Sequence, residues 1–417
     1  MRSVYIIGTY TTQFKKWPEK TFKDLVKDAY LGCLSDAGIN NGSDIGFAYF
    51  GNCAMSLWGQ DNLRGHVCFI PLVREGLFPE RVPIVNVEGA CATGSMAFHA
   101  AWKDILSGQS EVTLAIGVEK MFFEDDKAKI FRFLEDGIDT FDREETIEAY
   151  RTAATKCGKK FGPGPDRSFF MDTYAVQACY HMWRYKTSQR QMAIASSKNH
   201  YYGSLNPKAQ YQFEVPVEQV LEDRMVVYPF TRAMCAPIGD GAAAAILCSE
   251  DYLKTLPSKV QDRSVKVRAS AFAGGKYRDI DEPSESRVAA QQAYQTAGIY
   301  PEDIDVAEIH DATSFCEIYQ VEMLGFCPIG EGGKFVESGA TMIDGRIPIN
   351  TSGGLVSKGH PIAATGLSMI YELATQLRGE AGARQVKNPE FALQENGGGI
   401  IGLDEAACSV IILQKDR

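Results

Sequence analysis

Apolar and polar positions alternate in two distinct ways in the first third of the chain. Apolar runs at 82–87 and 113–118 have the length of buried strands. In the segment between them, 95–106, apolar residues recur at helical spacing, at Met96, Ala97, Ala100, Ala101 and Ile105. The order strand, helix, strand predicts a mostly parallel sheet covered by helices. We therefore expect an α/β fold.

The same pattern occurs a second time further along the chain. Three pairs of segments resemble each other: 37–45 and 297–304, 81–94 and 346–366, and the segments that start at Asp240 and Asp404. The first pair is typical of a helix end, a turn and a strand, and the second pair ends each time on Ala-Thr-Gly. The chain is therefore predicted to contain two copies of one αβ unit.

The two copies differ in length. The first carries about 108 additional residues, which we assign to an inserted loop or lid domain at 119–234. The N-terminal half would then comprise 1–118 plus 235–260, and the C-terminal half 261–417. The insert is richer in aromatic and charged residues, which suits a lobe that covers a site, although a surface decoration fits that composition equally well.

Composition and charge exclude several classes of protein. The 417 residues are 45% hydrophobic, which excludes a disordered chain, and the net charge of -10 without a basic tract argues against nucleic-acid binding. There is no apolar run long enough for a membrane helix and no signal peptide pattern at the start. The eleven cysteines show no metal-ligand spacing, so we expect reduced thiols, no metal site and a cytoplasmic protein.

Cys91 is the candidate nucleophile. It lies in Gly-Ala-Cys-Ala-Thr-Gly, between a predicted strand and a predicted helix. The positive end of a helix dipole and free backbone N–H groups favour a thiolate and can bind an oxyanion. The alternative is a buried structural cysteine, which is how most free cysteines behave. The glycine-bracketed turn favours the catalytic interpretation.

Two of the six histidines occur at predicted turns of the second copy. His310 lies in Glu-Ile-His-Asp-Ala-Thr, and His360 lies in Lys-Gly-His-Pro-Ile-Ala-Ala-Thr-Gly, within a turn seven residues longer than its counterpart in the first copy. Each could equally be a turn histidine held by backbone hydrogen bonds. The run that starts at Asn396, Asn-Gly-Gly-Gly, lets backbone approach a ligand closely, although a flexible hairpin is the simpler interpretation.

In this order, these motifs resemble the thiolase superfamily over essentially the whole chain. His310 stands where biosynthetic and degradative thiolases usually carry Asn, so the chain resembles the sterol-carrier-protein-type branch. That branch includes archaeal acetoacetyl-CoA thiolases and the catalytic subunit of benzoylsuccinyl-CoA thiolase, which is the favoured close relative. The resemblance implies a duplicated, five-layered αβαβα fold with the active site between the two halves.

The resemblance also assigns roles. It implies that Cys91 forms an acyl-enzyme from a 3-oxoacyl-CoA, that CoA is the co-substrate, and that the Cys91 thiol is activated by His360. His310 and His360 would hold the thioester oxygen of the enolate, and the backbone N–H groups of Cys91 and Gly398 would form a second oxyanion hole. The supporting residues of the site loops would be Lys358, Asn396 and Gly397.

The chain departs from the family pattern at two positions. Common thiolases carry an acid/base cysteine where this chain has Asn396, and sterol-carrier-type enzymes often carry one where it has Ala312. The proton for the departing enolate must therefore come from elsewhere. We expect His310 or His360 to supply it, with Cys316 or water as alternatives.

Other functions remain open at this point. A decarboxylating ketosynthase shares the Cys, His, His order but usually has Thr-Gly-His rather than Lys-Gly-His-Pro, and related retro-aldolases generally lack the nucleophilic cysteine. A catalytically silent CoA-binding subunit is the alternative from a different class.

The partners and the substrate are implied less directly. Thiolases commonly form dimers or higher oligomers, and relatives with His-Asp-Ala often work with a small zinc-ribbon and OB-fold partner. An aromatic acyl pocket would draw on Trp58, Phe122, Phe123, Phe133 and Tyr150.

Overall fold

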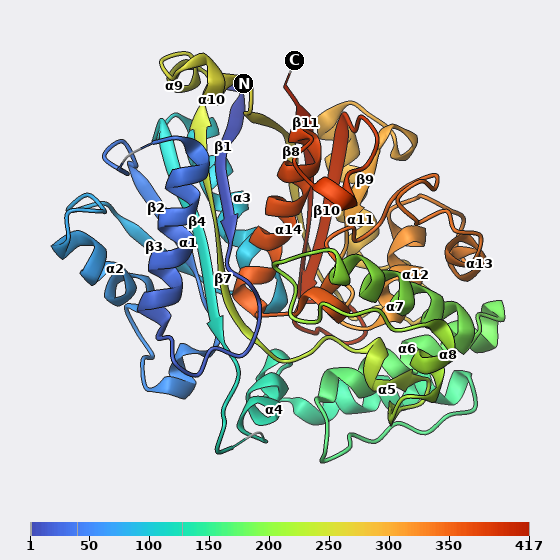
Figure 1. Ribbon diagram of the computed structural model, residues 1–417. Helices are drawn as coiled ribbons and strands as arrows, with labels where there is room; N and C mark the ends of the chain where they lie inside the picture. The colour runs from blue at the N-terminus through green and yellow to red at the C-terminus, as the bar shows by residue number, and fades with distance from the viewer. Residues whose placement is uncertain (1, 40, 127, 417) are drawn as a thin grey trace.

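Within the described residues, nine strands form one continuous sheet at the centre of the molecule, and its two half-sheets, joined by one antiparallel strand pair, lie side by side in Figure 1. The computed structural model describes residues 2–39, 41–126 and 128–416. The N-terminal half-sheet has the order β3 (Ile84–Val87), β2 (Phe47–Gly51), β4 (Val112–Lys120), β7 (Asp240–Ser249) and β1 (Val4–Thr11). The C-terminal half-sheet has the order β8 (Val265–Gly274), β11 (Ala407–Lys415), β10 (Phe391–Gly398) and β9 (Val306–Glu308).

Most strand pairs are antiparallel, so the prediction of a mostly parallel sheet is wrong. The β2–β3, β2–β4 and β9–β10 pairs are parallel, as strand–helix–strand units require. The long strands β1, β7, β8 and β11 pair with their neighbours in antiparallel fashion. Because β7 returns from the insert against β4, and β11 follows β10 as a hairpin, each half-sheet is mixed.

Helices pack on both outer faces and between the half-sheets, which gives the five predicted layers. The central layer consists of α3 (Thr93–Ser107) and α14 (Ile362–Arg378), which contact each other and strands of both half-sheets. One outer face carries α1 (Phe22–Ala37) and α2 (Arg64–Arg74), and the other carries α11 (Glu285–Ala297) with α12 (Ser314–Met323) packed beside it. Three large clusters of buried apolar side chains fill the spaces between these layers.

Equivalent helices of the two copies end in the same way, as the duplication predicts. The helices α1 and α11 end at left-handed Gly38 (φ 68°) and Gly298 (φ 70°). The central helices α3 and α14 end at Gly108 (φ 78°) and Gly379 (φ 76°). Glycine adopts this conformation at little cost, so each is a helix stop fixed by sequence.

One predicted element is reduced in the second copy. The counterpart of β3, at 346–350, forms a single bridge between Ile349 and Ala307 instead of a strand. The backbone turns there because Asn350 has a positive φ of 56° and donates its N–H to the carbonyl of Ala307. The chain then enters the π-helical turn Gly354–Lys358, which leads to His360.

The segment between β4 and β7 is mainly helical. It contains α4 (Ala128–Leu134), α5 (Arg143–Lys156), α6 (Phe169–Tyr185), α7 (Gln189–Ser204), α8 (Val217–Glu222) and the hairpin of β5 (Met225–Val227) and β6 (Phe230–Thr231). Figure 1 shows α5 to α8 in green below the C-terminal half-sheet, and α4 in blue-green below the middle of the molecule. The remaining short helices are α9 (Glu250–Leu253), α10 (Ser258–Gln261) and α13 (Gly332–Glu337). Within the described residues, there is no helix that is both long and apolar enough to span a membrane.

Candidate active site

Cys91 lies in a sharp turn between β3 and α3. The turn is a single helical turn, Ala90–Ala92, that leads directly into α3, and Ala90 has an unfavourable positive φ of 49°. The Thr93 hydroxyl stabilises the turn, because it accepts the N–H of Gly89 (2.9 Å) and donates to the carbonyl of Ala90 (2.7 Å). Cys91 itself is half-buried and lines two cavities.

His360 is in direct contact with Cys91. Its Nε2 lies 3.1 Å from Cys91 Sγ, and its Nδ1 lies 2.7 Å from Thr365 Oγ1. The Thr365 hydroxyl donates its one hydrogen to the carbonyl of Pro361 (3.0 Å), so it must accept from Nδ1–H of His360. The proton of the neutral imidazole is thus on Nδ1, and Nε2 presents a lone pair to the Cys91 thiol.

His310 is the third member of the cluster. It follows β9, and its ring centroid lies 5.1 Å from that of His360. The backbone N–H of His310 donates to Glu395 Oε2 (3.1 Å), whereas neither nitrogen of its ring has a hydrogen-bond partner among the described residues. One nitrogen or sulfur atom from each of Cys91, His310 and His360 lies within 4.8 Å of the others. The expectation that the site works without a metal stays a prediction.

Burial keeps all three groups uncharged. It lowers the pKa of His310 to about 4, and it lowers the pKa of His360 well below its usual value, with the proximity of His310 as a second cause. Burial, followed by the effect of Glu405, raises the pKa of the Cys91 thiol. The expectation that the helix N-terminus favours a resting thiolate is therefore wrong, because the cost of desolvation is larger. Cys91 is a thiol that needs His360 as its base.

The glycine run lies against the nucleophile turn. A Cβ atom at Gly398 would lie 2.7 Å from the backbone nitrogen of Cys91, so a glycine is needed for this close approach. The Asn396 amide is used internally, because its Oδ1 accepts from Ser95 (2.8 Å) and its Nδ2 donates to the carbonyl of Gly397 (3.3 Å). Asn396 thus holds the loop, and its side chain is not directed at the cavity.

Lys358 also supports the site without lining its cavities. It is the last residue of the π-helical turn, its side chain is buried, and its Nζ lies 3.4 Å from Glu308 Oε2. Of the residues predicted from the sequence, the structure therefore brings Cys91, His310, His360 and Gly398 together, whereas Lys358 and Asn396 hold the loops on which His360 and Gly398 lie.

A cavity of 470 Å³ opens in front of Cys91 and His360. Its walls come largely from the insert and include Phe122, Phe123, Phe131, Phe170 and Tyr174. Of the aromatic residues predicted to line an acyl pocket, Phe122 and Phe123 do so, Phe133 lines a smaller cavity at Cys91, and Trp58 stacks on Phe123 at 4.7 Å. Tyr150 lies at a separate cavity.

Two polar residues of the site were missed from the sequence. Thr365 belongs to the Ala-Thr-Gly of the second copy and lies in the first turn of α14. Its position five residues after His360 is the sequence signal that could have indicated its hydrogen bond to the imidazole. Glu405, which lies 3.9 Å from His310 Nδ1, follows the glycine run in the loop between β10 and β11, and its sequence neighbourhood carries no such signal.

Fold and site together define an α/β enzyme of the cysteine-dependent acyl-transfer class. Two family models match the chain, the thiolase N-terminal domain over residues 4–228 and the thiolase C-terminal domain-like model over 271–414. The chain belongs to the thiolase family. This confirms the predicted family, the α/β fold class and a thiolase-type acyltransferase activity.

Relatives with curated names cover nearly the whole chain. An acetyl-CoA acetyltransferase of Methanothermobacter thermautotrophicus is 37% identical over 96% of this chain and 98% of that protein. Sterol carrier protein 2 of Homo sapiens is 34% identical over 98% of this chain and 74% of its own length. The benzoylsuccinyl-CoA thiolase subunit BbsB of Thauera aromatica is 31% identical over 95% of each chain.

Solved structures show the same fold at low sequence identity. The Ltp2-ChsH2(DUF35) aldolase has a TM-score of 0.76 at 22% identity, and it covers 100% of this chain and 98% of its own. The human mitochondrial 3-ketoacyl-CoA thiolase in complex with CoA has a TM-score of 0.65 at 17% identity, with the same coverage.

Proposed function

We propose that the protein cleaves a 3-oxoacyl-CoA with CoA through an acyl-enzyme on Cys91. The observation that carries this proposal is the 3.1 Å contact between Cys91 Sγ and His360 Nε2, in the tautomer that accepts a proton, at the wall of a 470 Å³ cavity. His360 takes the thiol proton while Cys91 attacks the 3-keto carbon, and the bond between carbons 2 and 3 breaks.

Polar groups around Cys91 are suited to hold the charge that develops. Backbone N–H groups of Cys91 and Gly398 are proposed to bind the oxyanion of the tetrahedral intermediate, and a donor of this kind typically contributes about 3 to 4 kcal/mol. Neither ring nitrogen of His310 has a hydrogen-bond partner among the described residues, and we propose that one of them holds the thioester oxygen of the enolate. CoA then enters as the second substrate and takes the acyl group from Cys91.

The acyl group is proposed to be aromatic. The phenylalanine side chains that line the cavity support this, because aromatic rings bind each other favourably edge-on or in offset stacks. Lys16, Arg167 and Arg224 line the same cavity and are candidates for the contacts to CoA phosphates in this acidic protein. The relative named benzoylsuccinyl-CoA thiolase subunit agrees with such a substrate, whereas the acetyl-CoA acetyltransferase name favours acetoacetyl-CoA.

A thiolysis screen tests both the proposed reaction at Cys91 and the proposed aromatic acyl group. The full-length protein is assayed with CoA and acetoacetyl-CoA, a long-chain 3-oxoacyl-CoA or an aromatic 3-oxoacyl-CoA. Cys91→Ala and His360→Ala are expected to lower the rate by orders of magnitude, while Cys316→Ala retains activity. Wild-type turnover with none of the three substrates, or the reverse ranking of His360→Ala and Cys316→Ala, contradicts the proposal.

The assembly and location of the protein are also proposed. We infer a homodimer or higher oligomer, because the edge strand β3 is largely uncovered, with 40% of Val85 exposed. We also propose a small partner protein with a zinc ribbon and an OB-fold. The names of two similar proteins support a partner, because BbsB is called a subunit and the aldolase structure pairs Ltp2 with ChsH2(DUF35). Eleven free cysteines fit the cytoplasm. Light scattering of the purified protein, with and without copurified partners, tests the assembly.

A further inference from the structure

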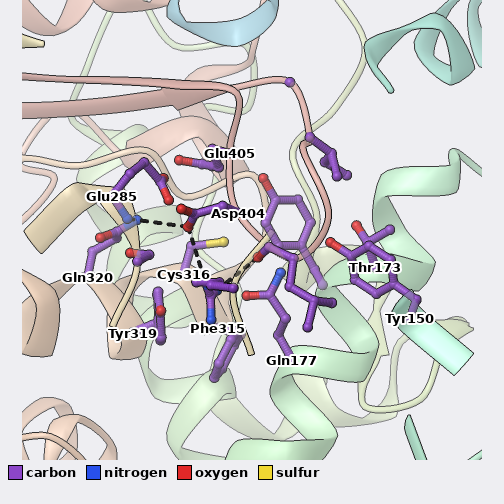
Figure 2. A pocket seen from close by; sticks show the side chains of 16 residues that line it. Tyr150, Thr173, Gln177, Glu285, Phe315, Cys316, Tyr319, Gln320, Asp404 and Glu405 are labelled. Atoms are coloured by element: carbon purple, nitrogen blue, oxygen red, sulfur yellow. Dashed lines mark hydrogen bonds and ion pairs between the residues drawn. The ribbon is translucent and has the colours of Figure 1, made fainter. Parts of the chain in front are cut away.

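A small cavity lined by both polar and apolar side chains lies beside the cluster of Cys91 and the two histidines. It measures 30 Å³, room for about one water molecule or two. Figure 2 shows the side chains of Glu285, Asp404 and Glu405 at one end of this cavity, with Cys316 beneath them. Tyr174 lines both this cavity and the 470 Å³ cavity, so the two share a wall.

Glu405 is the carboxyl group of this cavity that faces the catalytic cluster. Its Oε1 lies 3.9 Å from His310 Nδ1, and its buried Oε2 has no hydrogen-bond partner among the described residues. A Cβ atom at Gly397 would lie 1.4 Å from that Oε2. The absence of a side chain at Gly397 thus provides the space that the Glu405 carboxyl occupies.

The surroundings of Glu405 contain more carboxyl groups than cations. The titratable and charged groups around it are Glu285 from α11, Glu395 from β10, Cys408 from β11, Cys316 from α12, Tyr150 and Tyr174 from the insert, the adjacent Asp404, Arg278, and His310 and Cys91 from the site. The guanidinium of Arg278 binds Asp404 at 2.9 Å. Burial first, and then Glu395, raise the pKa of Glu405 to about 8, so Glu405 holds its proton at neutral pH.

We propose that Glu405 supplies, through His310, the proton that the departing enolate receives. The inference rests on the proposed thiolase reaction. Neither Ala312 nor Asn396 has an acidic side chain, and the buried, unpartnered ring of His310 lies between Glu405 and the Cys91–His360 pair. The 3.9 Å separation has to shorten when substrate binds, as catalytic contacts commonly do.

The protons balance over the whole cycle. In the first half, the Cys91 thiol proton moves to His360, and the enolate carbon takes a proton from His310, which is replaced by the proton of Glu405. The products are the acyl-enzyme, the shortened CoA thioester, a His360 imidazolium and a Glu405 carboxylate. In the second half, Glu405 regains a proton from the CoA thiol by way of His310, the CoA sulfur takes the acyl group, and the Cys91 thiolate takes back the proton from His360.

Cys316 is the rival donor, and its contacts make it the poorer one. It lines the same small cavity, but burial raises the pKa of its thiol to about 12, and its Sγ lies 3.4 Å from Thr313 Oγ1. Because its pKa is higher, the Cys316 thiol is a weaker acid at neutral pH than the Glu405 carboxyl group. Cys316→Ala is therefore a matched control, since it removes a titratable group from the same cavity.

The first half-reaction isolates the proposed step. Full-length enzyme is mixed with acetoacetyl-CoA, or with the best substrate of the screen, in the absence of CoA, and the burst of shortened CoA thioester is followed in a single turnover. We expect Glu405→Gln to slow this burst about 100-fold or more, Glu405→Asp to slow it less, and Cys316→Ala and Glu285→Gln to remain within about threefold of wild type. Gly397→Ala, whose Cβ displaces the Glu405 carboxyl, is expected to slow it as well.

The pH profile separates a proton donor from a structural residue. In the wild type the burst rate falls as pH rises through about 8, where Glu405 ionises, and this limb disappears in Glu405→Gln. A wild-type burst rate in Glu405→Gln, an unchanged basic limb, or equal losses in Glu405→Gln and Glu285→Gln would overturn the inference. Failure of the proposed function is distinct, because the wild type would then give no burst and Cys91→Ala would not differ from it.

Discussion

At the scale of single residues, the resemblance of the motifs around Cys91, His310 and His360 to those of thiolases predicted which side chains meet, although these residues lie up to 269 positions apart. What the sequence did not predict is the protonation of the site. A thiol at a helix N-terminus suggested a thiolate, but enclosure by the insert and by α14 makes desolvation the larger effect. The contacts of Thr365 and Glu405 depend on tertiary packing in the same way.

Thr365 determines the tautomer of His360, which gives a prediction at this scale. Thr365→Val keeps the shape but removes the acceptor of Nδ1–H, so the imidazole proton can shift to Nε2 and block proton transfer from Cys91. We expect kcat to fall about 10- to 100-fold. Thr365→Ser restores the hydroxyl and should recover most of the rate in the same thiolysis assay. Equal activity in Thr365→Val and wild type would refute this role.

At the scale of elements, local signals predicted the helix at 95–106 and the helix ends in 37–45 and 297–304, but they did not predict the direction of the strands. Residues 82–87 and 113–118 do form parallel strands around a helix, yet β7 and β11 approach from distant parts of the chain and pair in antiparallel fashion. A pattern of apolar residues does not indicate which strand will pair with a given strand, or in which direction. The 346–350 segment likewise had the composition of a strand, but the turn at Asn350 ends its pairing after one bridge.

The contact of α14 with β4 gives a prediction for an element pair. A Cβ atom at Gly117 in β4 would lie 2.0 Å from the carbonyl oxygen of Ala363, so Gly117→Ala must push the start of α14 away from the sheet. We expect the free energy of unfolding in urea to fall by about 1 to 3 kcal/mol, with a loss of activity because His360 lies three residues before Ala363.

Gly162→Ala is the matched control for this variant. A Cβ atom at Gly162 would meet no atom within 4 Å, so this substitution should leave both stability and rate near wild type. If Gly117→Ala were as stable and as active as Gly162→Ala, the close packing of β4 and α14 would not position His360.

At the scale of the whole molecule, the duplication and the insert were visible in the sequence, and they explain why the site has two kinds of wall. Polar groups come from the ends of matching elements in the two halves, while the apolar cavity wall comes mostly from the segment between β4 and β7. The domain boundaries at 118, 235 and 261 stay a prediction.

Buried carboxyl groups make stability depend on pH. Burial raises the pKa of Glu119 and Glu395 to about 7 and of Glu405 to about 8, above the unfolded value of 4.5. Between pH 6.5 and 8.5 the folded state therefore binds more protons than the unfolded state, so stability falls as pH rises. The buried histidines with lowered pKa values act in the opposite direction, but only near pH 6.5, where the unfolded histidines still bind protons; they are His99, His200, His310 and His360.

Thermal unfolding at different pH values tests whether stability falls as pH rises. We expect the midpoint to fall by about a few degrees from pH 6.5 to pH 8.5, and to fall less in Glu405→Gln, which has one fewer carboxyl group to ionise. A midpoint that rises over this window would show that these carboxyl groups are ionised in the folded protein.

The two Ala-Thr-Gly segments meet where α3 and α14 begin, since a Cβ atom at Gly94 would lie 2.7 Å from the carbonyl oxygen of Ala363. The residue before the first Ala-Thr-Gly is Cys91, and the residue before the second is Ala363. Thr93 holds the turn of the nucleophile, while its counterpart Thr365 holds the base. The same short sequence thus holds the nucleophile in one copy and the base in the other. A cysteine engineered at Ala363 would create no second active site, because the first copy has no histidine at the position that corresponds to His360.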